Sequence, residues 1–325
     1  MDIVEIGIIC YSVVSCCFSL GVIFTILFFK SMRKGNFLPI ILYMSISDVG
    51  LNLASALGFP NNGTAACWIQ GLAQNYFALS GWFWTTILTY RVYCFVRYGR
   101  CRLKKRFMHL IAWGLPLFLT FIPLTTTNYG NDGGGRQTCV YSHRQGSAEW
   151  LVTFWRYTTF FGWLFICIIL MFVWQLITYF KFRHTQMKAL VGRTYDKVYL
   201  YPIAMMTCWS LSFCSNALSL HSAVSLRPLN VFFGISTGVL SALIFLVKSE
   251  EARRRWQAYF TPPCRDTIVI SIDATIRPDF ELDGDDDDWE LDSAPPQSSM
   301  FTQDVEISDI TMSDYAAQNP VHEQL

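Results

Sequence analysis

The sequence predicts an all-α membrane protein: a seven-transmembrane helix bundle, a short amphipathic eighth helix and a disordered tail. Hydrophobic residues make up 52% of its 325 residues and charged residues only 15%, well below the charged share of ordinary soluble domains. Seven apolar runs are each long enough to cross the hydrocarbon core of a bilayer. Basic residues gather in alternate connectors between these runs, as they do in chains that cross a membrane several times.

The apolar runs set the expected boundaries of the helices. They cover about residues 3–29, 37–58, 67–96, 107–124, 150–180, 198–221 and 229–247. We therefore expect a transmembrane bundle over residues 1–247, an amphipathic juxtamembrane helix over 248–260 and an acidic, disordered cytoplasmic tail over 261–325.

The connectors predict the orientation in the plasma membrane. Bases are concentrated in the odd connectors: Lys30, Arg33 and Lys34, then six between Arg97 and Arg106, then Lys181, Arg183, Lys188, Arg193 and Lys197. The even connectors hold only Arg136, Arg144 and Arg227. Because positive connectors stay in the cytoplasm, we expect the amino terminus outside and the carboxyl terminus inside. The inner bases are candidates for contact with a protein partner or with anionic lipid of the bilayer.

The second run places Asp48 about eleven residues into a helix. An ionised carboxylate at that depth is costly unless it has partners or water. We therefore expect Asp48 to belong to an internal polar network, where it is a candidate conformational switch, rather than to face lipid.

Two candidate modification sites, one for glycosylation and one for a disulfide, involve the predicted outer connectors. Asn62 begins an Asn-Gly-Thr sequence, which is a candidate glycosylation site although it lies close to the bilayer. Cys67 and Cys139 share the one oxidising compartment, so we expect them to form a disulfide; the alternative is a pair of free thiols. Such a bridge would pull the second outer connector down over the bundle.

The third run, "CWIQGLAQNYFALSGWFWTTILTYRVYCFV", carries amides near one end and an arginine near the other. Gln70, Gln74, Trp84 and Arg91 fall on one stripe of a helix, which we expect to face the bundle interior. The amides then lie at the outer mouth, either as ligand contacts or as hydrogen bonds between helices. Arg91 lies at the inner mouth, where it either reaches lipid headgroups or pairs with an acid on a neighbouring helix.

The fifth and sixth runs contribute further candidates. Arg156 lies about two turns into the fifth run, where a guanidinium needs an anion, a carbonyl or water; a bound anion and Glu149 are the two partners that we weigh. Pro202 predicts a kink near the inner end of the sixth helix, with Trp209 two turns further out. The candidate ligand-binding residues are Gln70, Gln74, Arg156, Asn216, His221 and Arg227. The histidines are too isolated to predict a metal site.

After the seventh run, "SEEARRRWQAYF" alternates charges with aromatic residues and predicts an amphipathic helix along the inner leaflet. Cys264 follows it and is either palmitoylated or left as a free thiol. Residues 261–325 carry 16 acidic and 2 basic residues, a net charge of −14, whereas residues 1–260 carry 8 and 23, a net charge of +15. The tail is expected to be disordered, and its hydroxyls to be either substrates of a kinase that recruit an arrestin-like protein or merely solvated.

Three of these runs resemble the cAMP-receptor-like family of G-protein-coupled receptors, which includes slime-mould cAMP receptors and plant relatives. The matched residues are Ser47 and Asp48 in the second run, Cys67, Gln70, Gly71, Tyr76, Phe77, Ser80, Trp84 and Thr85 in the third, and Tyr201, Pro202 and Trp209 in the sixth. The resemblance covers roughly residues 5–260. The seventh run departs from the family because it lacks a polar, asparagine-containing inner half. It also has no lysine before Lys248, which argues against a retinal Schiff base and an opsin.

The resemblance implies a receptor in which a small extracellular ligand biases a two-state bundle that activates a heterotrimeric G protein. An anionic, cyclic-nucleotide-like ligand suits Arg156. The expected activation switch comprises Asp48, Trp84, Arg91, Pro202 and Trp209, although the rhodopsin-like Asp-Arg-Tyr triplet is replaced by "TYRVY" around Arg91. No catalytic residue, cofactor or nucleic-acid partner is expected.

Two other function classes remain as alternatives: a membrane transporter and a ligand-independent seven-helix modulator. A transporter favours paired half-helices, repeats or several charges at the midplane, and Asp48 alone is a poor match. A membrane enzyme would need clustered metal ligands or a nucleophile beside its base, and the sequence predicts neither.

Overall fold

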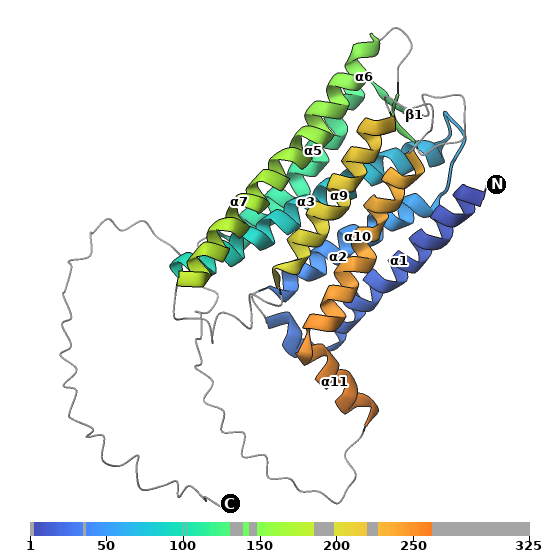
Figure 1. The fold of residues 1–325 in the computed structure, drawn as a ribbon. Helices are drawn as coiled ribbons and strands as arrows, with labels where there is room; N and C mark the ends of the chain where they lie inside the picture. The colour runs from blue at the N-terminus through green and yellow to red at the C-terminus, as the bar shows by residue number, and fades with distance from the viewer. Residues whose placement is uncertain are drawn as a thin grey trace, which may run out of the picture. The chain divides into compact units, whose positions relative to one another are not determined.

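The computed structural model describes residues 3–34, 37–99, 101, 103–130, 139–142, 148–184, 198–219 and 227–261. Within them, seven long helical segments run through one bundle (Figure 1). Single helices form five segments: α1 Ile3–Phe28, α2 Leu38–Ala56, α3 Ala65–Tyr98, α9 Leu200–Ser219 and α10 Arg227–Lys248. The fourth segment joins α4 Lys105–His109, η2 Leu110–Gly114, α5 Leu115–Phe121 and η3 Ile122–Thr125, and the fifth joins α6 Glu149–Trp155, η4 Arg156–Phe161 and α7 Gly162–His184.

Composition alone marks only part of this bundle as membrane-spanning. Five helices of the described chain are long and apolar enough to cross a membrane: Ile3–Phe28, Leu38–Ala56, Lys105–Thr125, Trp150–Lys181 and Val231–Lys248. The apolar part of α9, Leu200–Cys214, is shorter. The 34-residue α3 is too polar to be counted among the five.

The polarity of α3 is explained by its central place in the bundle. It packs against α2, α5, η2, α7 and α9, and every residue from Ala78 to Thr89 is buried. The expectation that one stripe faces the interior was too narrow, because neighbouring helices cover the middle of α3 on all sides. Its polar groups therefore meet protein rather than hydrocarbon.

Local sequence explains where α3 begins and ends. Thr64 caps its first turn, with the hydroxyl oxygen accepting a hydrogen bond from the Cys67 N–H at 3.3 Å. Gly99 ends the helix in the left-handed conformation, at φ 71°, a backbone region that glycine enters without steric cost.

Helices α1, α2 and α10 approach one another closely through small residues. The Ser15 hydroxyl donates to the carbonyl oxygen of Ile235 at 2.9 Å. A Cβ atom at Gly238 would lie 2.6 Å from the Ser15 Oγ and 2.9 Å from the Asn52 Nδ2. Small residues at such a contact let helix backbones come together, which is how membrane helices gain packing energy without a hydrophobic driving force.

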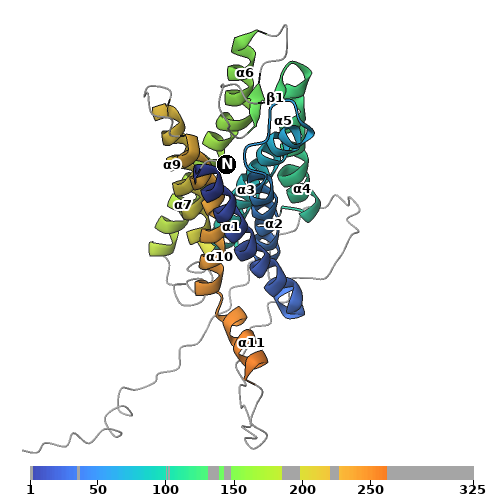
Figure 2. The ribbon, with the colours of Figure 1, turned by 90° about the vertical axis from the view of Figure 1, so that its right-hand side faces the viewer.

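A short β-hairpin covers one end of the bundle, on the side of α5 and α6 (Figure 2). Its strands β1 Asn128–Gly130 and β2 Val140–Ser142 are antiparallel and pair Tyr129 with Tyr141. The predicted disulfide between Cys67 and Cys139 is confirmed, and it joins the first turn of α3 to the residue before β2. We call this the hairpin end.

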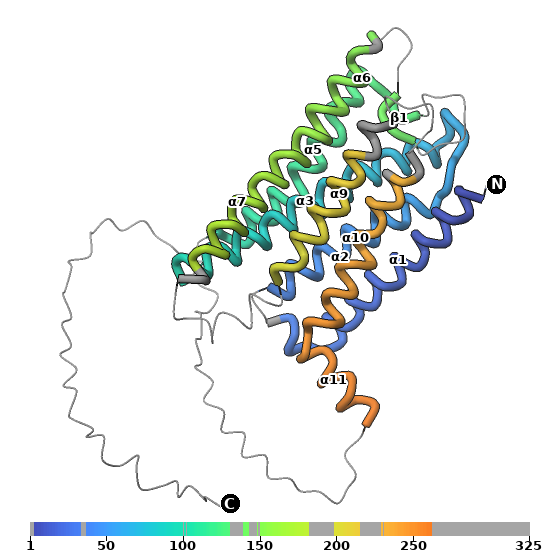
Figure 3. The backbone as a smooth tube through the Cα atoms, in the orientation of Figure 1, coloured from blue at the N-terminus to red at the C-terminus, as the bar shows by residue number. Residues whose placement is uncertain are grey.

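The opposite end carries α11 Glu250–Phe260, which leaves α10 at an angle (Figure 3). We call it the α11 end. Ser249 caps α11, and the Trp256 ring stacks on Phe28 of α1 at 5.8 Å between centroids. The Trp256 indole N–H also donates to the Thr25 hydroxyl at 3.3 Å. These contacts attach α11 to α1.

The hairpin packs directly against Gly71 of α3. A Cβ atom at this position would lie 2.5 Å from the Tyr129 ring and 3.1 Å from the Cys139 carbonyl oxygen. We predict that Gly71→Ala destabilises the purified chain by about 1–3 kcal/mol, because the buried Tyr129 ring must move. Thermal unfolding followed by fluorescence checks this.

The matched control is Gly21→Ala in α1, where nothing lies within 4 Å of the added atom. That variant should be as stable as the wild type or slightly more so, because alanine costs a helix less than glycine. Equal melting temperatures for the two variants would contradict the close seating of the hairpin.

Candidate ligand site and switch residues

Gln70 ties the hairpin to the helices beneath it. Its side chain is fully buried, and its amide N–H groups donate to the carbonyl oxygens of Gly58 at 2.7 Å and Ala54 at 3.2 Å. Its amide oxygen accepts from the backbone N–H of Cys139 at 3.0 Å. Both amide hydrogens are engaged by protein, so Gln70 has none left to donate to a ligand. It has the interhelical role that the sequence left open beside ligand contact.

Glu5 extends this network to α1, and sequence reasoning missed it. The carboxylate is buried, and its Oε1 accepts from the backbone N–H of Phe59 at 3.1 Å. Phe59 follows Gly58, which accepts from Gln70. The start of α1, the α2–α3 connector, α3 and the hairpin are thus joined by consecutive hydrogen bonds. The one sequence feature that could have pointed to Glu5 is that acidic residues are scarce at the predicted outer end of the bundle.

Gln74 and Asn75 lie one turn deeper and are half-buried. The Gln74 amide donates to the Ser55 hydroxyl of α2 at 3.2 Å. The Asn75 amide reaches the Tyr129 hydroxyl at 3.3 Å, and that hydroxyl donates to the Thr120 carbonyl oxygen at 3.2 Å. Tyr129 therefore links the hairpin to α3 and to α5. Burial raises the pKa of Tyr129 and of Tyr141, so both hydroxyls remain protonated at neutral pH.

Arg156 is the first residue of η4, a π-helical turn within the fifth segment. In this turn the Gly162 N–H bonds to the Tyr157 carbonyl oxygen, and a Cβ atom at Gly162 would lie 2.8 Å from that oxygen. Wide turns of this kind occur often at functional sites. The half-buried Arg156 guanidinium lies 3.5 Å from the Tyr141 carbonyl oxygen of the hairpin. The Glu149 side chain, the other partner weighed from the sequence, lies outside the described residues.

Three further predicted ligand contacts cannot be placed by their side chains. His221 lies outside the described residues. Asn216 stands in α9 and Arg227 opens α10, and only their backbone is described. All three stay predictions.

An aromatic cluster fills the bundle below this polar layer. The Trp209 ring meets Trp82 edge-to-face at 4.7 Å between centroids, and Trp82 meets Phe160 at 4.7 Å. Both indoles are more than nine-tenths buried, and their N–H groups have no acceptor among the described residues. Buried donors normally have a partner, in protein or in bound solvent or ligand. Sequence reasoning named Trp209 and missed Trp82, because Trp82 lies off the predicted stripe.

The other predicted switch residues include one on α2 and two on α3. Asp48 is buried, and its Oδ1 accepts from the Thr237 hydroxyl of α10 at 3.2 Å, which is the type of internal partner that the sequence required. Trp84 is fully buried, stacked on Tyr43 at 4.7 Å and placed edge-to-face with His109 at 5.2 Å. Arg91 is half-buried near the α11 end of α3. The switch residues thus lie on α2, α3 and α9, and Trp84 and Trp209 belong to the same buried apolar cluster.

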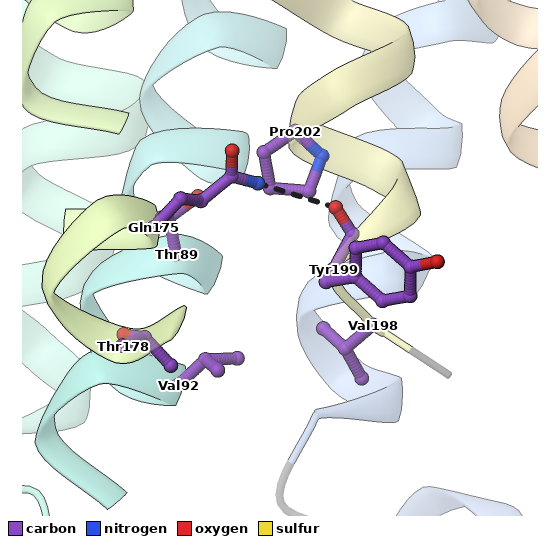
Figure 4. A pocket seen from close by; sticks show the side chains of 7 residues that line it. All are labelled: Thr89, Val92, Gln175, Thr178, Val198, Tyr199 and Pro202. Carbon is purple, nitrogen blue, oxygen red and sulfur yellow. Dashed lines mark hydrogen bonds between the residues drawn. The ribbon is translucent and has the colours of Figure 1, made fainter. Parts of the chain in front are cut away.

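A small cavity, with room for about one water molecule, lies between α3, α7 and the start of α9 near the α11 end (Figure 4). The Gln175 amide of α7 crosses its wall and donates to the Tyr199 carbonyl oxygen at 3.2 Å. Pro202 lines the same cavity from the first turn of α9, where its missing N–H leaves no bond unmade. Only Val198 and Tyr199 are described directly ahead of α9, so the kink of a longer sixth helix stays a prediction.

The remaining predicted sites concern modification and metal binding. Asn62 is exposed beside the hairpin, and the hydroxyl of Thr64 in its glycosylation sequence serves as the cap of α3. Cys264 and the tail beyond it lie outside the described residues. Among the residues that are described, no three His, Cys, Asp or Glu side chains gather into a possible metal site.

The comparisons with known proteins point to a fold. No family model matches the chain. The squid rhodopsin crystal structure superposes with a TM-score of 0.63, covering 79% of this chain and 80% of rhodopsin at 16% sequence identity. The chain therefore has the seven-helix membrane fold. At this identity the likeness concerns the fold alone.

A second similarity is to the sequence of a receptor-like protein. Latrophilin receptor-like protein A of Dictyostelium discoideum is 24% identical over 114 residues, which are 34% of this chain and 37% of that protein. The match thus spans little more than a third of that relative. The match assigns neither a ligand nor a signalling partner to this chain.

The hydrogen bonds of Gln70 lead to a test of its structural role. We predict that Gln70→Leu sharply lowers the yield and melting temperature of folded protein, because each buried group left unpaired at Cys139 and Gly58 costs about 1–3 kcal/mol. Gln74→Leu is the matched control: it removes one half-buried bond to Ser55 and should remain within about 1.5 kcal/mol of the wild type. If both variants fold alike, the central role of Gln70 at the hairpin end is refuted.

Proposed function

We propose that this chain is a G-protein-coupled receptor that senses a small extracellular ligand at its hairpin end and activates a heterotrimeric G protein at its α11 end. The observation that carries the proposal is a seven-helix membrane bundle with a disulfide-anchored cap at one end. No step of this function requires catalysis or a cofactor.

The orientation belongs to the proposal and rests on two arguments. Basic connectors are expected on the cytoplasmic side, which places the α11 end inside. The Cys67–Cys139 disulfide belongs in an oxidising compartment, which places the hairpin end outside.

The chemistry of the hairpin end favours a ligand rich in hydrogen-bond acceptors. The Arg156 guanidinium lies at the edge of the hairpin, and the Trp82 and Trp209 indole N–H groups below it have no acceptor within the described part of the chain. These groups are all donors, and anionic oxygens accept from them best. A small anionic ligand of the cyclic-nucleotide type therefore suits the site. Gln74, Asn216, His221 and Arg227 are further proposed contacts, and Gln70 supports the site from beneath the hairpin.

Signal transfer to the α11 end requires an element with two arrangements. We assign this role to α9, because it carries Trp209 in the aromatic cluster and Pro202 at the cavity. The Gln175–Tyr199 hydrogen bond would hold the start of α9 against α7 in the resting state. Movement of α9 away from α7 would widen the cavity for a G protein, with Asp48, Trp84 and Arg91 adjusting the balance between the two states.

Finer parts of the proposal rest on sequence. The cAMP-receptor-like family is supported by its matched residues in three helices, among them Asp48, Trp84 and Pro202. Kinase sites and an arrestin-like partner are proposed for the acidic tail, glycosylation for Asn62 and palmitoylation for Cys264. A transporter and a ligand-independent modulator are the competing functions.

The direct test is guanine-nucleotide exchange on a heterotrimeric G protein by the full chain in lipid nanodiscs, with a panel of cyclic nucleotides and small organic acids. We expect one compound class to accelerate exchange. Arg156→Ala should weaken its potency about 10-fold or more, since an ionic hydrogen bond contributes about 1.5–3 kcal/mol. Arg156→Lys, which keeps the charge but loses the planar fork, should lie between the two.

Gln74→Leu and Arg91→Ala serve as companion variants. The first should reduce potency without changing basal exchange, and the second should change basal exchange without changing potency. Absence of exchange under all conditions, together with substrate flux into liposomes, would replace the receptor by a transporter. Basal exchange that no compound alters would favour the ligand-independent modulator.

A further inference from the structure

Polar and aromatic side chains meet where α2 and the fourth segment approach each other beside α3 (Figure 2). The centroids of the Tyr43 ring of α2 and the His109 ring of α4 are 4.8 Å apart. Both rings also contact Trp84 of α3, whose ring centroid lies 5.9 Å from that of Trp113 in η2. Trp84 is buried, whereas Tyr43, His109 and Trp113 are half-buried, so part of each lies at the surface of the bundle. We call these three residues the aromatic face.

The polar atoms at this face have no protein partner among the residues that the structure describes. The Tyr43 hydroxyl and the His109 imidazole make no hydrogen bond to any of them. The indole N–H of Trp84, beneath the two rings, is buried and also has no acceptor there. Buried donors normally have a partner in protein, solvent or ligand. Tyrosine and histidine can each donate a hydrogen bond, so the face offers donors that an acceptor-rich molecule would satisfy.

Positive charge lies at the α11 end of the same segment. Lys104 and Lys105 are exposed there, one turn before His109. The sequence has no acidic residue between Asp48 and Asp132, a stretch that includes α3, the connector after it and the fourth segment. None of these parts of the chain can therefore neutralise the two ammonium groups. Their charge favours an occupant that carries a negative charge.

The groups are arranged by depth in the membrane. Lys105, His109 and Trp113 follow one another at a spacing of four residues, so each lies about 6 Å deeper than the one before it. The lysines are then at the level of lipid phosphates, His109 is near the ester groups and Trp113 is beside the first part of the acyl chains. Basic sites between membrane helices bind anionic headgroups, and Trp and Tyr rings favour the interface. A phospholipid matches all three levels, whereas a small soluble anion matches only the first.

We propose that the chain has a binding site for an anionic phospholipid, built from Tyr43, Lys104, Lys105, His109 and Trp113. The ammonium groups hold the negatively charged headgroup, and the Tyr43 and His109 donors bind its phosphate or ester oxygens. An acyl chain lies along the Trp113 ring. Placement in the inner leaflet rests on the orientation of the proposed function. Recognition of the lipid itself requires only the seven-helix bundle, and neither an extracellular ligand nor a G protein.

The test uses the full chain in nanodiscs of phosphatidylcholine that contain a small fraction of phosphatidylserine with a photoreactive diazirine in its acyl chain. Illumination and mass mapping should find the label on or next to Tyr43 or Trp113. Unlabelled phosphatidylserine should displace it. Phosphatidylcholine that carries the same diazirine chain should label these positions far less. Both leaflets of the nanodisc have one composition, so the result does not depend on the orientation or on receptor activity.

Charge variants separate the site from general attraction to an anionic membrane. Lys104→Gln together with Lys105→Gln should lower phosphatidylserine labelling of the aromatic face about 5-fold for each base removed. The matched control is Arg253→Gln together with Arg254→Gln, which removes two exposed bases from α11 at the same end of the bundle. This control should be labelled as the wild type is.

Tyr43→Phe tests the hydrogen bonds with the ring retained. It should weaken labelling about 10-fold, because it removes one donor to a charged or ester oxygen. An intact Cys67–Cys139 disulfide and an unchanged melting temperature show that each variant has folded.

Two results would overturn the proposal. Equal labelling by the serine and choline lipids, or unchanged labelling after both lysines are replaced, would show that the aromatic face only contacts the surrounding bilayer. Displacement of the label by a sterol but not by unlabelled phosphatidylserine would assign the face to a neutral lipid instead.

Discussion

The structure depends on one constraint: polar groups placed within a membrane must find partners inside the protein. Helix α3 shows how the bundle meets it. The helix is too polar to be counted among the membrane-spanning stretches, yet its middle is buried on every side by neighbouring helices. Its hydroxyls donate to backbone carbonyl oxygens one turn earlier, as Thr85, Thr86 and Thr89 do. The other helices can then present apolar faces to lipid.

The same constraint organises the hairpin end. Gln70 satisfies backbone groups of the α2–α3 connector and of the hairpin at once, and Glu5 extends the network to α1. These groups would otherwise be buried without partners. The hairpin is therefore held to the helices by hydrogen bonds as well as by the disulfide. Gly71 completes the arrangement, because only a residue without a side chain lets the Tyr129 ring lie on α3. The Arg156 guanidinium lies against the Tyr141 carbonyl oxygen of this hairpin.

The fold was largely predictable, and the site only in part. Long apolar runs and the charge of the connectors identify a seven-helix membrane protein, and the position of two cysteines in one compartment predicts their bond. Roles were harder to predict. Gln70 and Gln74 are one turn apart and look equivalent in sequence, yet protein groups accept both amide hydrogens of Gln70, whereas the half-buried Gln74 donates to the Ser55 hydroxyl. Trp82 and Thr237 were missed because nothing local distinguishes them from residues that only pack.

The sequence by itself predicted which segments are apolar enough to meet lipid and on which side of the membrane the basic connectors are expected. These are properties of single segments, so composition and spacing reveal them. Tertiary structure alone decided which helix lies at the centre and which polar groups meet. Asp48 of α2 meets Thr237 of α10, and Gln70 of α3 meets the Cys139 backbone of the hairpin. Such pairs depend on how surfaces distant in sequence pack, and packing is a property of the whole bundle.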